Sequence, residues 1–244
     1  FGLAFFRRKD APLRIRARHI RLPRPEMIAK IFSVGSAPFF MEISFVVYMT
    51  IMNQLVLKYG GDAGLSAMGI FLSLDSLIFL PAMAVGEATQ PIVGYNYGAG
   101  KPERVVKAIR FALMIAVGFY VVSGALAEIF APQLMGLFTD DAELLRIGVP
   151  GMRVGYLGIP FMGITIITNS ALQGLGKGAA SLALSFCRHV FCMFVPLLTL
   201  PRIFGLKGVW MSFPCGDIGG SIIAACFLIW IIRWLKSPQA LAVK

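Results

Sequence analysis

The chain has 244 residues, of which 57% are hydrophobic, and a mean hydropathy of +0.77. Soluble domains typically have about 45–50% apolar residues, so this composition argues against an ordinary soluble enzyme. The formal net charge of +11 would suit a nucleic-acid-binding protein. However, the Lys and Arg residues gather in a few loops beside apolar runs, as the positive-inside rule describes for membrane proteins.

The first thirty residues differ sharply from the rest of the chain. Residues 1–6, Phe-Gly-Leu-Ala-Phe-Phe, are apolar but too short to cross a bilayer. We interpret them as the tail of a truncated preceding transmembrane helix. Residues 7–30 hold nine Lys or Arg residues and three prolines, which predicts a basic cytoplasmic loop that lies against anionic lipid headgroups.

Residues 31–235 are expected to form a lobe of six transmembrane helices, because a span needs about 20 mainly apolar residues. The predicted spans are residues 31–57, 65–94, 111–130, 147–172, 180–200 and 208–230. The fourth is expected to be broken at Pro150 and Pro160. Basic residues are about three times as frequent in the loops expected inside as in those expected outside. Both ends of the chain, including a tail at 236–244, are therefore predicted to be cytoplasmic.

Two of the expected inner turns repeat one pattern. Gly98-Ala-Gly-Lys101 follows the second predicted span, and Gly174-Leu-Gly-Lys177 follows the fourth. Repeated hairpins are a common construction in transporters, although Gly and Lys are also what any inner turn requires.

Ionisable side chains inside a bilayer cost about 2.5–3.5 kcal/mol, so each one suggests a function or a buried partner. Glu42 and Asn53 are eleven residues apart, close to three helical turns, and therefore share a helix face near Pro38. We expect them to line a wet cavity that binds a cation or substrate. The alternative is a carboxylate that is hydrogen-bonded between helices and has no transport role.

The second predicted span contributes three more candidates for binding substrate or cation. Asp75 lies near mid-span in Leu-Ser-Leu-Asp-Ser, where the serines offer an alternative, purely structural partner. Glu87 and Gln90 are one helical turn apart toward the inner end. They form either an inner gate or ion pairs with the inner Lys and Arg residues.

Three weaker candidates remain. Asn96 lies in the polar stretch before the first inner turn, and His189 lies beside Arg188 in the fifth span. His189 is a candidate for a proton relay, although a hydrogen bond across helices is the simpler interpretation. Asp217 lies in Pro-Cys-Gly-Asp-Ile-Gly-Gly, where glycine permits close helix approach, so we favour a packing role for it.

No pattern indicates catalysis. The chain shows no Ser-His-Asp or Cys-His set with nucleophile spacing and no cluster of metal ligands, and its four cysteines form no Cys-x-x-Cys pair. We predict no enzyme activity, no cofactor and no structural metal. A carboxylate inside a membrane can hold a proton, a metal ion or a cationic substrate one at a time, which is the simplest basis for antiport.

The segment Gln90-Pro-Ile-Val-Gly-Tyr-Asn-Tyr-Gly-Ala-Gly-Lys-Pro-Glu-Arg104 resembles the multidrug and toxic compound extrusion (MATE) transporters, in their bacterial and archaeal branch. Gly35-x-x-Pro38 and the segment 172–177 agree with the resemblance. It implies a fold of two six-helix bundles, of which this chain corresponds to the second, helices 7–12. It also implies export of organic cations and other drugs in exchange for Na⁺ or H⁺, through a cleft between the bundles.

The resemblance transfers no coupling residue to this chain. Family members with a glutamate in the seventh helix place it further from the proline than Glu42 lies from Pro38, and the fourth span here is apolar near Met162 where they have an aspartate. The expected function is cation-coupled efflux across a cell membrane by an assembly with a missing N-terminal lobe or a second copy. The expected partners are the lipid bilayer and a small organic cation, and no nucleic acid.

Two other functions stay open at this point. One is a lipid-linked saccharide flippase of the same superfamily, for which an Arg-rich cavity is expected, whereas Arg188 is the only basic residue deep in a predicted span. The other is a membrane fragment that does not transport.

Overall fold

The computed structural model describes residues 25–237, apart from the side chains of Glu26 and of residues 29–41. The chain divides into two units, 1–40 and 41–244, and the second is described below. Several expectations lie outside the described residues: the helix tail predicted at 1–6, the basic loop predicted up to residue 24, the side chains of Gly35-x-x-Pro38, and the tail at 238–244.

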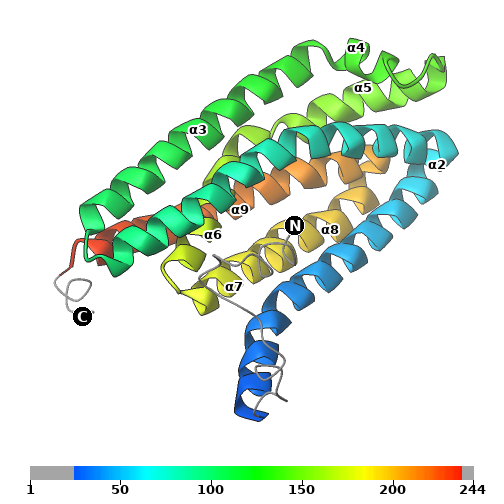
Figure 1. Ribbon diagram of the computed structural model, residues 1–244. Helices are drawn as coiled ribbons and strands as arrows, with labels where there is room; N and C mark the ends of the chain where they lie inside the picture. Colours follow the sequence, from blue (N-terminus) through cyan, green and yellow to red (C-terminus); the bar gives the residue numbers. More distant parts are fainter. Residues whose placement is uncertain (1–24, 238–244) are drawn as a thin grey trace, which may run out of the picture. The chain divides into compact units, whose positions relative to one another are not determined.

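Every regular element between residues 25 and 237 is a helix, which confirms the all-helical class for the described part of the chain. The elements are α2 (Pro25–Gly98), α3 (Pro102–Ile129), α4 (Ala131–Gly136), α5 (Ala142–Tyr156), α6 (Ile159–Gly174), α7 (Gly178–Cys187), the π-helix η2 (Arg188–Phe194), α8 (Val195–Phe204) and α9 (Leu206–Leu235). Figure 1 shows them in the colours of the sequence.

Helix α2 consists of two helices that join at Gly61. This residue has φ 61° and ψ −162°, a conformation that only glycine adopts without strain. The connection expected between the predicted spans 31–57 and 65–94 is therefore a single-residue break, and the two legs of α2 meet there at a sharp bend (Figure 1).

Several boundaries differ from those expected. Helix α2 begins at Pro25, inside the expected loop, because proline suits the first turn of a helix. The expected break at Pro150 is wrong, since Pro150 lies exposed inside a continuous α5. The chain instead breaks at Leu157 and Gly158, where α5 and α6 meet at 49°, and Pro160 lies in the first turn of α6.

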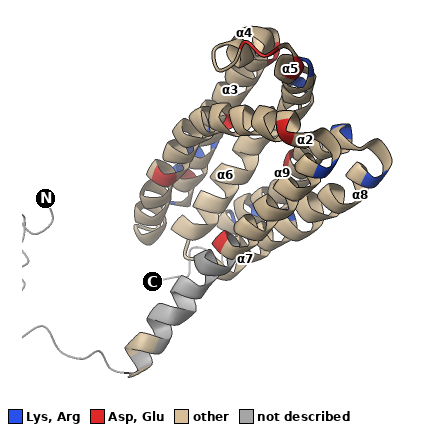
Figure 2. Ribbon diagram, turned by 90° about the vertical axis from the view of Figure 1, so that its right-hand side faces the viewer, with Lys and Arg blue, Asp and Glu red and all other residues tan. Residues whose placement is uncertain are grey.

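Four helical segments between residues 25 and 237 are long and apolar enough to cross a membrane, or five if the bent pair α5–α6 forms one span. One of the four, Glu42–Gly98, has 57 residues and contains the Gly61 break. Large apolar side chains such as Leu77 and Met114 are 66% exposed, as in a surface that contacts lipid rather than water. Charged residues occupy only short patches of the ribbon in Figure 2.

Helix α9 packs against α5, α6, η2 and α8. Glycines make the close approaches possible: a Cβ at Gly151 of α5 would collide with the Trp210 ring of α9, and one at Gly208 would collide with the carbonyl group of Leu200. An apolar core around Tyr48, Phe71 and Trp210 fills one region of the unit. A second core forms around Ile109, Ile167 and Ile231.

Candidate ion site inside the helical unit

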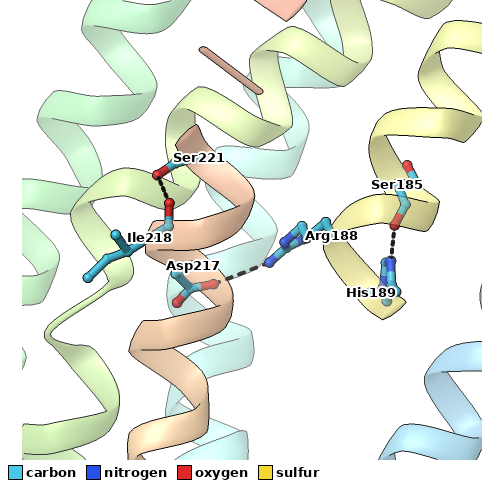
Figure 3. A network of polar contacts seen from close by, with 6 residues as sticks. All are labelled: Ser185, Arg188, His189, Asp217, Ile218 and Ser221. Atoms are coloured by element: carbon cyan, nitrogen blue, oxygen red, sulfur yellow. Dashed lines mark hydrogen bonds and ion pairs between the residues drawn. The ribbon is translucent and has the colours of Figure 1, made fainter. Parts of the chain in front are cut away.

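An ion pair lies between η2 and α9. The Nη2 atom of Arg188 is 3.2 Å from Oδ1 of Asp217, and the two side chains are only 14% and 13% exposed. Figure 3 shows Arg188 reaching across to Asp217. No other ion pair forms among the described side chains. The interaction joins two helices that are 29 residues apart in the sequence.

Two glycines of α9 allow η2 to approach closely beside this ion pair. A Cβ at Gly220 would lie 2.8 Å from Cγ of Arg188, and one at Gly219 would lie 3.0 Å from Sγ of Cys192. The small side chains let η2 lie directly on α9, in agreement with the packing expected around Asp217. On the other side, a Cβ at Gly158 would lie 2.9 Å from Cβ of Asp217. The α5–α6 break therefore lies against the same turn of α9.

Three distorted helical segments thus meet around Asp217. They are the break at Gly158, the π-helix η2 and the part of α9 that contains Pro214. π-helical turns and broken membrane helices leave backbone groups available to ligands, and they frequently occur at functional sites. These distortions make the region around Asp217 a candidate binding region.

Asp75 lies on the second leg of α2, half-buried, and makes no hydrogen bond or ion pair with any described residue. The neighbouring serines do not pair with it, because Ser73 and Ser76 donate to the carbonyl groups of Gly69 and Leu72, each at 2.9 Å. The alternative of a carboxylate satisfied by its serine neighbours is therefore wrong.

Two buried tyrosines lie near Asp75. Tyr120 of α3 and Tyr156 at the end of α5 are 0% and 3% exposed, and neither hydroxyl has a hydrogen-bond partner among the described residues. Both lie within electrostatic reach of Asp75. Phe71, one helical turn before Asp75 on the same face, stacks on Tyr156 with ring centroids 4.9 Å apart. The Tyr156 ring therefore lies beside this face of α2.

We call Asp75, Tyr120, Tyr156, Arg188 and Asp217 the interior polar cluster. Arg188 and Asp217 lie within electrostatic reach of both Asp75 and Tyr120, so the five groups share one region. Buried hydroxyls usually have a partner, and those of Tyr120 and Tyr156 have none within the described part of the chain. The cluster therefore holds one unpaired carboxylate and two hydroxyls able to bind a further group.

Glu42 and Asn53, the first pair of candidates, are both exposed on the first leg of α2. Neither forms a hydrogen bond or ion pair with a described residue. Glu42 lies within electrostatic reach of His189. The structure does not bring this pair into the interior polar cluster, so the cavity expected around them stays a prediction.

The candidates expected toward the inner end of the second predicted span do not belong to the interior polar cluster either. Glu87 is exposed and Gln90 is half-buried, and neither pairs with a described Lys or Arg residue. The Asn96 side chain donates to the carbonyl group of Ile92 at 2.8 Å, within its own helix. That bond is typical of a helix end and does not indicate a ligand site.

His189 points away from the ion pair in Figure 3. Its Nδ1 lies 2.8 Å from the carbonyl oxygen of Ser185, one turn earlier. It therefore bonds within its own helical run, not across helices as the simpler interpretation expected. Nothing in this geometry connects His189 to Asp217.

The tyrosines, and an amide network between α6 and α7, were not predicted from the sequence. Ser181 donates to Asn169, whose amide donates to Ser185 at 3.1 Å, and Gln173 donates to Ser181 at 3.3 Å. A tyrosine in an apolar run looks like any core aromatic residue, so its type and spacing gave no signal. Asn169 did give one, because an amide within a predicted span needs a partner.

The fold and the site define a class: a multi-pass helical membrane protein with a charged cluster in its interior. The family model described as MatE matches residues 38–197, which is more than half of the chain. The chain belongs to the MatE family, whose members are transporters and not enzymes.

Curated relatives and solved structures agree with this membership. The multidrug export protein MepA of Staphylococcus saprophyticus is 26% identical over 235 residues, covering 96% of this chain and 51% of MepA. A crystal structure of MATE in the bent conformation matches with a TM-score of 0.85 and 22% identity, covering 99% of this chain and 53% of that one. A MOP superfamily transporter from Pyrococcus furiosus matches with a TM-score of 0.81 and 22% identity, over 93% and 51% of the two chains.

The chain spans about half the length of the relatives it matches. This extent is consistent with one of the two lobes that the resemblance implied. The structural matches, below 25% identity, establish the fold.

Proposed function

We propose that this chain forms one lobe of a secondary transporter that exports organic cations in exchange for Na⁺ or H⁺. The observation that carries the proposal is Asp75, an unpaired carboxylate beside two tyrosine hydroxyls that have no described partner, inside an apolar helical unit. An ionisable group in such a position is costly and usually marks an ion or substrate pathway. The name of MepA, a multidrug export protein, supports the substrate class.

Within this proposal the two acids have different roles. Asp217 is neutralised by Arg188 at 3.2 Å and holds η2 against α9. Asp75 has no such partner among the described residues and accepts one cation at a time. The hydroxyls of Tyr120 and Tyr156, which have no hydrogen-bond partner among the described residues, offer lone pairs to a bound cation. Loading by Na⁺ or H⁺ therefore excludes a cationic substrate, which couples the two fluxes.

The proposed topology has six crossings, with the division of α2 at Gly61 supplying one and the bent α5–α6 pair counted as one. The turns around Gly100 and Gly176 then lie on the cytoplasmic side, because Lys101 and Lys177 follow them directly. Both ends of the chain are cytoplasmic in this topology. Substrate crosses a cleft between this lobe and a partner, either an N-terminal lobe or a second copy.

The flippase alternative receives less support. A phosphorylated saccharide lipid requires free arginines, and Arg188 is committed to Asp217. In the Pyrococcus furiosus transporter a reversed polarity of the binding pocket suggests a different function for that protein. In this chain the only unpaired charge of the interior polar cluster is the carboxylate of Asp75.

Efflux of a fluorescent organic cation tests the proposal. The chain, together with any further lobe that its gene encodes, is reconstituted into vesicles with an imposed Na⁺ or pH gradient. We expect gradient-driven efflux, and we expect Asp75→Asn to reduce it at least about tenfold, since a neutral amide takes up no proton and has no negative charge to balance that of Na⁺. Asp62→Asn, an exposed acid at the α2 bend, is the control and should transport normally.

Two results would contradict the proposal. One is efflux that ignores both gradients, and the other is an Asp75→Asn variant that couples as well as the parent protein.

A further inference from the structure

A groove lies on the exposed face of α3, near the N-terminal end of this helix. Its volume is about 470 Å³, and apolar atoms line almost all of it, including the hydrocarbon stems of its three basic residues. The lining residues are Arg104, Lys107, Ala108, Arg110, Phe111 and Met114. They lie on the side of α3 opposite Val105 and Ile109, which are fully buried against the rest of the unit.

The basic end of this groove carries three exposed cations. Arg104, Lys107 and Arg110 form no ion pair with any described acid, although Glu103 lies one helical turn before Lys107. Three unpaired cations within two turns, about 9 Å of helix, make this end strongly positive and can form charge-assisted hydrogen bonds with a phosphate group. This end of the groove therefore favours an anion.

The apolar end continues directly from the basic end. Phe111 and Met114 are 61% and 66% exposed. Met114 lies about 15 Å along the helix from Arg104. A free phosphate fills only the basic end, whereas a phospholipid has a charged head and a hydrocarbon chain joined in this order. The sequence of charge and apolar surface along α3 therefore fits a lipid lying parallel to the helix.

We propose that the groove of α3 binds an anionic phospholipid, with its phosphate held by Arg104, Lys107 and Arg110 and an acyl chain along Phe111 and Met114. This inference rests on the topology proposed above, in which the N-terminal end of α3 is cytoplasmic, because basic pockets on that side of a membrane bind such headgroups. Because α3 begins just after the Gly100 turn, a lipid there also holds the turn between α2 and α3 at the membrane surface. This site is independent of the transport reaction.

Lipid binding by the purified chain in detergent tests the proposal. The bound molecules are counted by native mass spectrometry during titration with phosphatidylglycerol, phosphatidylcholine or inorganic phosphate. The double variant Lys107→Gln/Arg110→Gln should bind phosphatidylglycerol about thirtyfold more weakly, since it loses two of three cationic contacts. The control Lys58→Gln/Arg202→Gln removes the same charge from exposed residues elsewhere and should bind within about twofold of the parent chain.

A second double variant separates lipid from phosphate. Phe111→Ala/Met114→Ala keeps all three cations, and we expect it to lose phosphatidylglycerol while its binding of inorganic phosphate is unchanged. The proposal would be overturned if the control variant lost as much affinity for phosphatidylglycerol as Lys107→Gln/Arg110→Gln does. It would also be overturned if the parent chain bound phosphatidylcholine as tightly as phosphatidylglycerol. A further pair of results would also overturn it: millimolar phosphate displaces phosphatidylglycerol, and Phe111→Ala/Met114→Ala binds the lipid normally. The groove would then bind only the anionic group and not the acyl chain.

Discussion

Replacing Asp217 by leucine is expected to lower the free energy of unfolding by about 3–5 kcal/mol, because the guanidinium of Arg188 would remain buried and unpaired. Arginine cannot lose its proton, so the variant has no way to remove that charge. Arg188→Met leaves a carboxylate, which can take up a proton, and should cost less. The Arg188 side chain is only 14% exposed, so water screens the effect little.

The double variant Arg188→Met/Asp217→Leu should recover most of the loss, because replacing both partners by apolar side chains removes the buried charges. Unfolding of the purified chain in detergent measures all three variants against Asp140→Leu, a control at an exposed acid. A double variant whose loss equals the sum of the two single losses would show that the pair does not interact, and would contradict this account of α9 and η2.

Gly208→Ala is expected to cost about 1–3 kcal/mol of stability through overpacking. Its Cβ would collide with the carbonyl group of Leu200 and lie 2.7 Å from the backbone nitrogen of Pro201. Both neighbours are backbone atoms, so no side-chain rotation relieves the collision. The turn at Gly205 and the packing of α8 on α9 depend on this contact.

Gly118→Ala is the matched control. No described atom outside the local backbone lies within 4 Å of its Cβ position, on a lipid-facing part of α3. Alanine there should raise stability by about 0.5–1 kcal/mol, because glycine is a poor helix former. If both substitutions changed the unfolding midpoint equally, the close approach of α8 and α9 would not depend on having glycine at position 208.

The apolar runs and two of the turns of this chain could be predicted from its sequence. The two Gly-x-Gly-Lys turns fold alike: Gly100 and Gly176 have φ 66° and 71°. The amides of Lys101 and Lys177 reach back to carbonyl groups at 3.0 and 2.9 Å. The repeated sequence produces a repeated backbone, because only glycine adopts this left-handed conformation easily.

The interior polar cluster could be predicted only in part. Asp75 and Asp217 stood out as acids within apolar runs, but the pairing of Arg188 with Asp217 is a contact over 29 residues and depends on how η2 packs on α9. The π-helix has no local sequence signal, whereas the break at Gly158 lies two residues before Pro160, one of the two prolines at which a break was expected. The contact of Lys177 with the Trp234 ring, at 3.6 Å, is likewise a product of packing.

The sidedness of two turns tests the central claim most directly, namely that the second leg of α2 crosses the membrane with Asp75 between its ends. The four native cysteines are replaced by serine, and Asp62→Cys or Ala99→Cys is introduced; both positions are exposed. A membrane-impermeant maleimide is then applied to intact cells. We predict that Asp62→Cys is labelled from outside and that Ala99→Cys is labelled only after permeabilisation. Labelling of both positions from the same side would contradict the account.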